Sequence, residues 1–116
     1  MESVTLNNGK TEREVNSLLE LNAVLTEANE GKGPILDLIV PLSPDESRRI
    51  STEIKTKLET DLSSARAFVI NEFMADANDE TKQIYFSDLV DDLRNLADFL
   101  DTAANEGLHI TPEFDS

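Results

Sequence analysis

The sequence predicts a mainly α-helical domain: an antiparallel bundle of three to four helices, with at most a short β element at the N-terminus. Two observations predict this class. Apolar residues recur at helical spacing through three long stretches, and each stretch opens with residues that favour a helix N-terminus. Alternation of apolar and polar residues, which is typical of a strand, is confined to the first ten residues. A chain of 116 residues is expected to form one domain, residues 1–116.

Residues 1–10 are expected to form an arm or a short strand. Val4 and Leu6 alternate with polar residues, and Asn8-Gly9 is a typical turn sequence. Three partners for such a strand stay open: residues 35–40, the tail near residues 108–110, or another subunit. Thr11 and Glu14 then have the spacing of a capping box, which predicts a helix over about 12–30 that ends near Gly31.

The segment from Pro34 to Pro41 holds a short apolar run, residues 35–40, whose periodicity fits either a buried strand or one helical turn. Its β-branched residues favour an extended conformation. The long segment 43–78 opens with Ser43-Pro44-Asp45-Glu46, a capping box with proline in the first turn. One unbroken helix over 44–78 would be about 50 Å long. We therefore expect either a break near residues 60–64, where weak helix formers gather, or an end that projects into a partner.

Residues 65–75 are apolar on nearly every side of the expected helix. Only Arg66, Asn71 and Glu72 are strongly polar there. A helix of this kind is buried in its own domain or against a second copy, so we expect the other helices to pack around it and we expect a homodimer. The predicted self-association residues are Phe68, Val69, Phe73 and Met74.

The last predicted helix starts near Ser87-Asp88 and ends at Gly107. Leucine and alanine residues form its apolar face, and Gly107 followed by Leu108 fits a Schellman C-cap with its hydrophobic contact. The tail, residues 108–116, is expected to be extended.

The net charge limits the classes of partner that the protein is expected to bind. The chain has 24 acidic residues against ten Lys and Arg, a net charge of −14. This field repels nucleic acid and anionic membranes and attracts basic proteins. The sequence has no Cys, which excludes disulfides, thiolate zinc sites and Cys nucleophiles, and it has no membrane-spanning run or secretory leader. We expect a cytoplasmic protein, in the host cytoplasm if the protein is viral.

Carboxylates recur along the last predicted helix. From Phe86 to Ser116 eight acidic residues accompany one arginine, a net charge of −7. A rigid acidic row can occupy a basic groove built for nucleic acid, which predicts a nucleic-acid mimic that inhibits a DNA- or RNA-binding protein, as a phage or mobile-element anti-defence factor would. The alternative interpretation is a solvated helix face. The predicted partner-binding residues are Asp88, Asp91, Asp92, Asp98 and Asp101.

The sequence contains no candidate arrangement for a catalytic nucleophile and no Gly-rich phosphate-binding loop. We therefore expect no enzyme activity, no cofactor and no metal. The second hypothesis for the function is that the protein is a small oligomeric scaffold or assembly adaptor. A third hypothesis rests on acidic pairs at 27–30, 72–76 and 88–91, an arrangement that resembles the metal-dependent all-α nucleotide pyrophosphohydrolases of the MazG type. The pattern departs from that family in its spacing, in Asp88 where Glu is usual, and in lacking Lys and Arg residues for phosphate.

Overall fold

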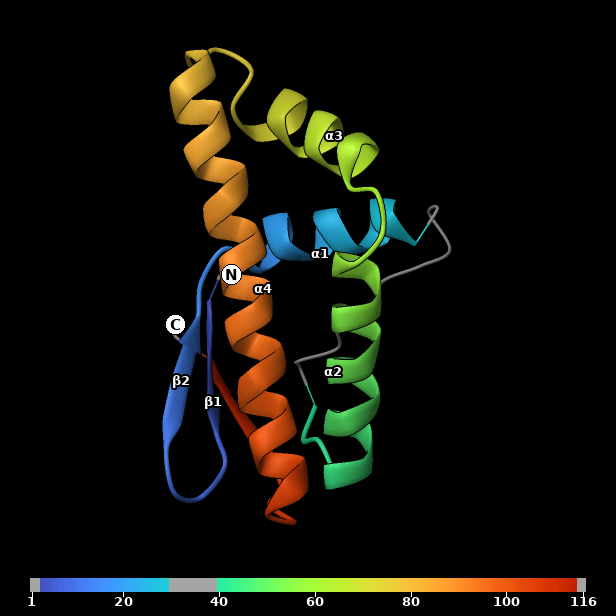
Figure 1. The fold of residues 1–116 in the computed structure, drawn as a ribbon. Coiled ribbons are helices and arrows are strands. Elements are labelled where there is room, and N and C mark those ends of the chain that lie inside the picture. The colour runs from blue at the N-terminus through green and yellow to red at the C-terminus, as the bar shows by residue number, and fades with distance from the viewer. Residues whose placement is uncertain (1–2, 30–39, 115–116) are drawn as a thin grey trace.

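The computed structural model describes residues 3–29 and 40–114, which form four helices and three strands (Figure 1). Their mainly helical content confirms the helical class that the sequence predicts, and a helical bundle with strands near the N-terminus is compatible with this structure. The segment 35–39, for which a strand or a helical turn was expected, lies outside the described residues. The elements in chain order are β1 Val4–Asn7, β2 Glu12–Val15, α1 Leu18–Ala28, α2 Pro44–Leu58, α3 Ser63–Phe73, α4 Asp79–Asn105 and β3 Thr111–Phe114.

The helices form two antiparallel pairs that lie across each other. In Figure 1, α2 and α4 run side by side in opposite directions, and α1 and α3 form a second pair that lies across them. With 27 residues, α4 is about 40 Å long, which is close to the 42 Å longest dimension of the molecule. The sheet lies beside α4, on the side away from α2 (Figure 1).

The sheet is antiparallel, with strand order β2-β1-β3. Asn8 makes the first turn: its buried side-chain oxygen accepts hydrogen bonds from the backbone N–H groups of Lys10 (2.9 Å) and Thr11 (2.8 Å). Gly9 follows with φ 89°, a conformation that favours glycine. This hairpin pairs residues 12–15 with β1 and buries Val15 opposite Val4. The prediction of a helix from residue 12 was therefore wrong, and α1 starts at Leu18.

The second partner of β1 is the C-terminal tail. β3 pairs with β1 so that Val4 lies opposite Phe114, and Leu42 and Ile110 exchange backbone hydrogen bonds of 2.8 and 2.9 Å. The tail was one of the three expected partners, and it is extended as predicted. β2 was not among the three, because its residues had been assigned to a helix.

The long segment is broken between Leu58 and Ser63, which is the first of the two alternatives that the sequence left open. α2 has the expected N-terminus, with the hydroxyl of Ser43 accepting from the backbone N–H of Glu46 (3.2 Å) and Pro44 in the first turn. The chain leaves the helix at Glu59. Asp61 then accepts hydrogen bonds from the backbone N–H (3.0 Å) and the hydroxyl (2.6 Å) of Ser63, at the start of α3.

The start of α4 is earlier than predicted. Asn78 is the N-cap, and its side chain accepts from the backbone N–H of Thr81 at 2.8 Å. Of residues 77–80, expected to be a polar hinge, Ala77 and Asn78 precede the helix, and Asp79 and Glu80 form its first turn. At the other end the Schellman prediction is confirmed: Gly107 has φ 69°, and the N–H of Leu108 donates to the carbonyl of Ala103 at 2.8 Å.

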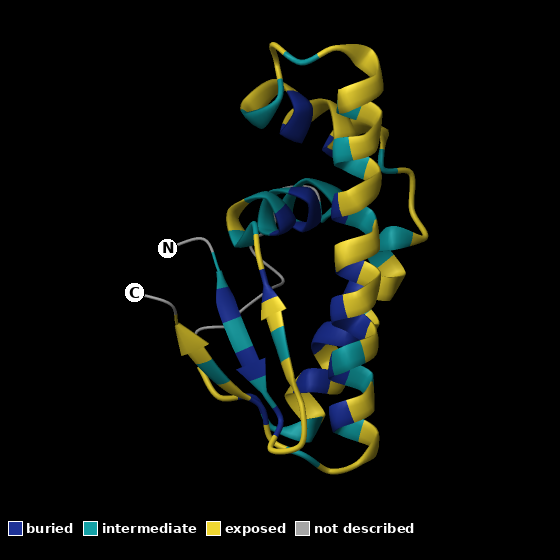
Figure 2. Ribbon diagram, turned by 90° about the vertical axis from the view of Figure 1, so that its left-hand side faces the viewer, coloured by how far each residue is buried: buried dark blue, intermediate teal, exposed yellow. Residues whose placement is uncertain are grey.

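The core lies between α2, α4, α1 and the inner face of the sheet (Figure 2). Segment 65–75 is not its centre, and that prediction was wrong. Within α3 only Ala65, Val69 and Ile70 are buried, and Phe68 is 39% exposed. α3 packs mainly on α1 at one end of the molecule, so several of its apolar residues face solvent. The fully buried large side chains are Leu6, Leu21, Leu25, Leu42, Ile50, Ile54, Leu93, Leu96, Leu100 and Ile110.

Candidate functional site

The five predicted partner-binding aspartates all lie on α4, but they do not form one row. With 3.6 residues per turn, Asp92 and Asp101 lie on opposite sides of the helix, about 180° apart. The structure divides the five into two groups. Asp88, Asp91 and Asp92 lie within about one turn and are all exposed, whereas Asp98 and Asp101 lie toward α2.

The group near α2 is paired with a lysine. The ammonium of Lys55 forms an ion pair with the carboxylate of Asp101, and its Nζ lies 3.6 Å from Oδ1 of Asp98. The hydrogen bond from Lys55 holds the pKa of Asp101 below its usual value, and a hydrogen bond from Ser51 acts in the same direction. The same bond raises the pKa of Lys55. These two aspartates therefore serve the contact between α2 and α4.

The group at Asp88, Asp91 and Asp92, hereafter the aspartate cluster, has little cationic compensation. Oδ1 of Asp91 lies 3.5 Å from Nη1 of Arg94, an exposed pair. Burial raises the pKa of Asp92, the negative charges of Asp88 and Asp91 raise it further, and Arg13 opposes the shift. A raised carboxyl pKa means that the surroundings disfavour the ionised form. The aspartate cluster thus concentrates negative charge.

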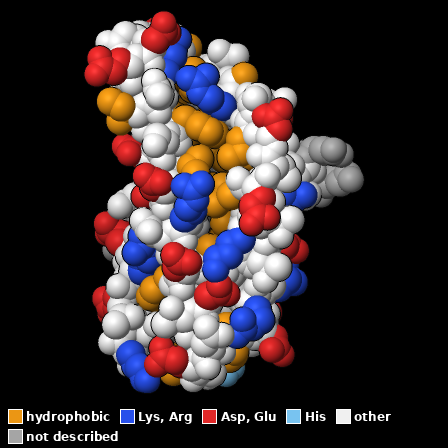
Figure 3. All heavy atoms as spheres, viewed as in Figure 1, with side chains coloured by type: hydrophobic (Ala, Val, Ile, Leu, Met, Phe, Trp, Pro, Cys, Tyr) orange, Lys and Arg blue, Asp and Glu red, His pale blue; other side chains and the backbone are white. Residues whose placement is uncertain are grey.

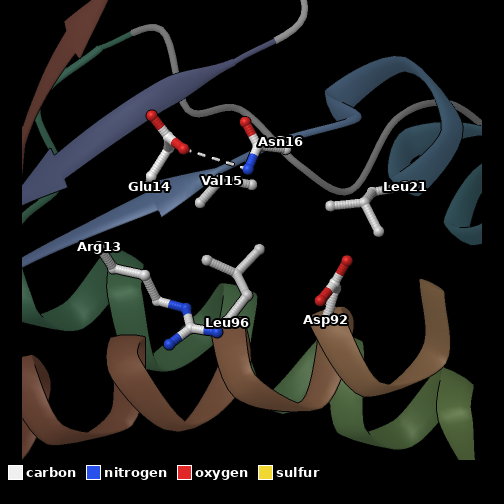
Figure 4. A pocket seen from close by; sticks show the side chains of 7 residues that line it. All are labelled: Arg13, Glu14, Val15, Asn16, Leu21, Asp92 and Leu96. Atoms are coloured by element: carbon white, nitrogen blue, oxygen red, sulfur yellow. Dashed lines mark hydrogen bonds between the residues drawn. The ribbon is translucent and has the colours of Figure 1, made fainter. Parts of the chain in front are cut away.

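A small hollow adjoins the aspartate cluster between β2 and α4. In Figure 4, Arg13 and Asp92 lie on either side of Leu96, and the amide of Asn16 donates to Glu14 at 3.2 Å. The hollow has a volume of about 50 Å³, whereas pockets for small-molecule ligands measure about 300–1,000 Å³. It has room for a few water molecules, so we assign it no substrate.

The junction of α1 and α4 carries a further carboxylate that the sequence did not single out. Burial raises the pKa of Tyr85 to about 12, and the negative charge of Glu20 contributes to this shift. The hydroxyl of Tyr85 and one carboxylate oxygen of Glu20 are buried without a hydrogen-bond partner among the described residues. Nothing in the local sequence links these two residues, because their approach depends on how α1 and α4 pack.

A second hollow lies on the seam between α2 and α4. Hydrophobic side chains are visible in a band down the middle of the face in Figure 3, with charged side chains of both signs beside it. The hollow measures about 230 Å³ and is lined by Lys55, Leu58, Glu59, Arg94 and Asp98. Two cations and two anions cancel, so this seam has no preference for an anion such as phosphate.

A third hollow, larger than the two above, is a groove of about 470 Å³ between α1 and α3, hereafter the α1–α3 groove. Its floor is apolar and two glutamates line it, one from each helix. Leu19 is 59% exposed there and was not predicted, although it lies out of phase with the buried stripe of Leu21, Val24 and Leu25. The lining residues are Leu19, Asn22, Ala23, Thr26, Glu27, Phe68, Glu72 and Phe73.

The predicted self-association residues are divided by the structure. Phe68 and Phe73 line the α1–α3 groove, and Val69 is completely buried within its own chain. Met74 is half-buried at the C-terminal end of α3. Two of the four thus remain accessible to a partner in the groove, and Val69 contributes to packing.

The carboxylates of the pyrophosphohydrolase hypothesis do not meet in one site. Glu27 and Glu72 share the α1–α3 groove, and none of the described residues that line it is Lys or Arg. Asp88 lies in the aspartate cluster. Within residues 3–29 and 40–114, no group of three or more His, Asp or Glu side chains could hold a metal ion.

Comparison with known proteins adds no assignment. No protein-family model, no curated protein and no solved structure matches the chain. Among the described helices, none combines the length and the apolar character needed to cross a membrane.

Proposed function

We propose that this chain is a non-catalytic binding module whose aspartate cluster engages a basic surface of a partner protein. In its most concrete form, the module takes the place of nucleic acid on a DNA- or RNA-binding protein. The observation that carries the proposal is the placement of Asp88, Asp91 and Asp92 within one turn on the exposed side of α4, where Arg94 is their one ion-pair partner among the described residues.

The raised pKa of Asp92 agrees with the proposal, because burial first and then the charges of its neighbours outweigh the opposing effect of Arg13. Ionised Asp92 is disfavoured by burial and by its two neighbours, and a Lys or Arg side chain brought by a partner would favour the ionised form. In the complex, the partner's cation would therefore offset the surroundings that disfavour ionised Asp92 in the free protein. The net charge of −14 adds long-range steering toward a basic partner.

The proposed binding surface uses only part of the acidic row that the sequence predicts. Asp98 and Asp101 already have a cation in Lys55, so a basic partner gains less from them than from the aspartate cluster. The binding surface that we propose is centred on Asp88, Asp91 and Asp92. This is shorter than the five-residue row that the sequence predicts.

The test compares the wild type with the triple variant Asp88→Asn, Asp91→Asn, Asp92→Asn. Each protein is immobilised and exposed to the heparin-binding fraction of a cell lysate, and the retained proteins are eluted with duplex DNA. We expect the wild type to retain proteins that DNA displaces, with retention falling steeply as salt rises. The triple variant should retain at least about tenfold less, since three charge-assisted contacts are lost.

The control variant removes the same number of charges elsewhere: Glu12→Gln, Glu59→Gln, Asp76→Asn, all at exposed positions. It should retain the wild-type level. The proposal is overturned if the two triple variants behave alike, or if duplex DNA does not displace the retained proteins.

A further inference from the structure

A second surface of the molecule, separate from the aspartate cluster, has the character of a docking site. The α1–α3 groove exposes two of the large hydrophobic side chains, Leu19 and Phe68, in one hollow of about 470 Å³. We infer that the α1–α3 groove binds a short amphipathic helix of a partner protein, with apolar residues on its buried face and Lys or Arg residues beside them. This inference is independent of the function proposed for the aspartate cluster.

The backbone around the groove favours a helical occupant. Both walls are helices, α1 and α3, whose N–H and C=O groups are hydrogen-bonded within each helix apart from the ends. An extended peptide gains affinity by adding to an open strand edge, and a helical wall has none. A helix satisfies its own backbone groups and can place its apolar face on Leu19, Ala23, Phe68 and Phe73.

The charged residues of the α1–α3 groove determine which sign of charge the occupant should carry. Glu27 on α1 and Glu72 on α3 line the groove together, and they are the charged residues among the described residues of its lining. Basic side chains on either side of the occupant's apolar face would pair with these two glutamates. The same charges disfavour an acidic helix, because like charges at an interface oppose association.

A second copy of this chain fits the groove poorly. A two-fold dimer places the same patch on both subunits, so the two glutamates of one groove would face a surface that carries the same two negative charges. Both subunits would carry a net charge of −14. The eight lining residues are also few beside the roughly 20–30 residues per side of a stable protein interface. A short segment of a basic partner avoids the charge repulsion and fits the small size of the groove.

The test uses three synthetic 18-residue peptides, long enough for measurable helicity. The first is a Leu/Lys peptide with leucine at helical spacing, the second is the same peptide with Glu in place of Lys, and the third has the Leu/Lys composition in scrambled order. Binding is measured by fluorescence anisotropy, and the site is mapped by NMR chemical-shift changes. We expect the first peptide to bind at least about tenfold more tightly than the others, which is 1.4 kcal/mol or more.

Four protein variants locate the binding. Phe68→Ser should weaken binding of the Leu/Lys peptide at least about tenfold, because a hydrophobic anchor is lost. Phe114→Ser removes a phenylalanine of similar exposure (43%) from β3 and should leave binding unchanged. The double variant Glu27→Gln, Glu72→Gln should weaken binding and reduce its salt dependence. The triple asparagine variant of the aspartate cluster should bind the peptide as the wild type does.

Several results would overturn the inference. One is equal binding of the Glu-containing or scrambled peptide. Another is a set of shift changes centred on Asp88, Asp91 and Asp92, which would assign the peptide to the aspartate cluster. A third is a dimer in light scattering that Phe68→Ser converts to a monomer, which would show that a second copy occupies the groove.

Discussion

The two ends of α4 lie in contrasting halves of the molecule. The closed half comprises α2, the sheet and residues 93–105 of α4, and the open half comprises α1, α3 and residues 79–92. In the closed half Ile50, Ile54, Leu93 and Leu100 are completely buried. In the open half Leu19, Phe68 and Ile84 are exposed.

The charges follow the same division. In the closed half Lys55 pairs with Asp98 and Asp101, and Lys10 pairs with Glu106 at 2.9 Å. In the open half the aspartate cluster raises the pKa of one of its own members, and Glu27 and Glu72 have no ion pair among the described residues. Both halves contribute to the core, since α1 also buries Leu21, Val24 and Leu25. The halves differ in that the open half presents more exposed apolar side chains and carboxylates without an ion pair among the described residues.

The largest expected effect tests the packing difference between the halves. Ile54→Ala in the closed half should lower the free energy of unfolding by about 2–5 kcal/mol, because a fully buried side chain is lost and a cavity remains. Leu19→Ala in the open half should change it by less than about 0.5 kcal/mol. Urea denaturation followed by circular dichroism measures both. A large loss for Leu19→Ala would show that the open half is packed as firmly as the closed one.

A smaller effect is expected at the ion pair between α2 and α4. Asp101→Asn should lower the free energy of unfolding by about 0.5–1 kcal/mol at pH 7, since the pair is partly exposed and screened. The folded-state pKa of Asp101 lies below its unfolded value, so its contribution is present above the unfolded pKa of about 3.9 and is lost as pH falls through the folded pKa. Denaturation curves at several pH values should show the difference between wild type and variant disappear in acid; a difference that persists below pH 2 would contradict this assignment.

The smallest effect has the opposite sign and lies in the open half. Asp92→Asn should raise the free energy of unfolding at pH 7 by about 0.5 kcal/mol or less, because partial burial and the charges of its neighbours disfavour ionised Asp92 and solvent screens much of this effect at an exposed residue. The folded-state pKa of Asp92 is raised, so the unfavourable contribution is present above that pKa and fades as pH falls through it. Thermal unfolding at pH 7 and at pH 3 measures the sign and its loss. If the variant proves less stable than the wild type at pH 7, Asp92 is a stabilising residue and the contrast with Asp101 is removed.

Local patterns predicted the helix ends best. The capping box at Ser43 and the Schellman turn at Gly107 depend on neighbours within a few residues, and both are present. The weak helix formers near residues 60–64 also marked the place of the break, although the sequence left an unbroken helix open. One local signal was missed, the cap of α4 at Asn78, which accepts from the backbone N–H of Thr81. The failure at residue 12 occurred because a distant segment decided the outcome. The helix expected from residue 12 gave way to β2, because pairing with β1 and burial of Val15 outweigh a local capping pattern.

The prediction of the candidate sites was also limited by contacts between segments that are distant in the sequence. The sequence identified the aspartates of α4 and the apolar character of residues 65–75. It could not show that Lys55, which is 46 positions away from Asp101, neutralises part of the acidic row. It also could not show that Leu19 and Phe68 meet in one groove, since this depends on α1 packing against α3.

The sequence by itself determined the helical class, the acidic charge and the ends of α2 and the C-terminus of α4, because propensity, capping and composition act over a few residues. Only the tertiary structure decided which carboxylates are paired, which apolar residues stay exposed and where the sheet forms. These outcomes depend on contacts between segments far apart in the chain, and local spacing carries no information about them.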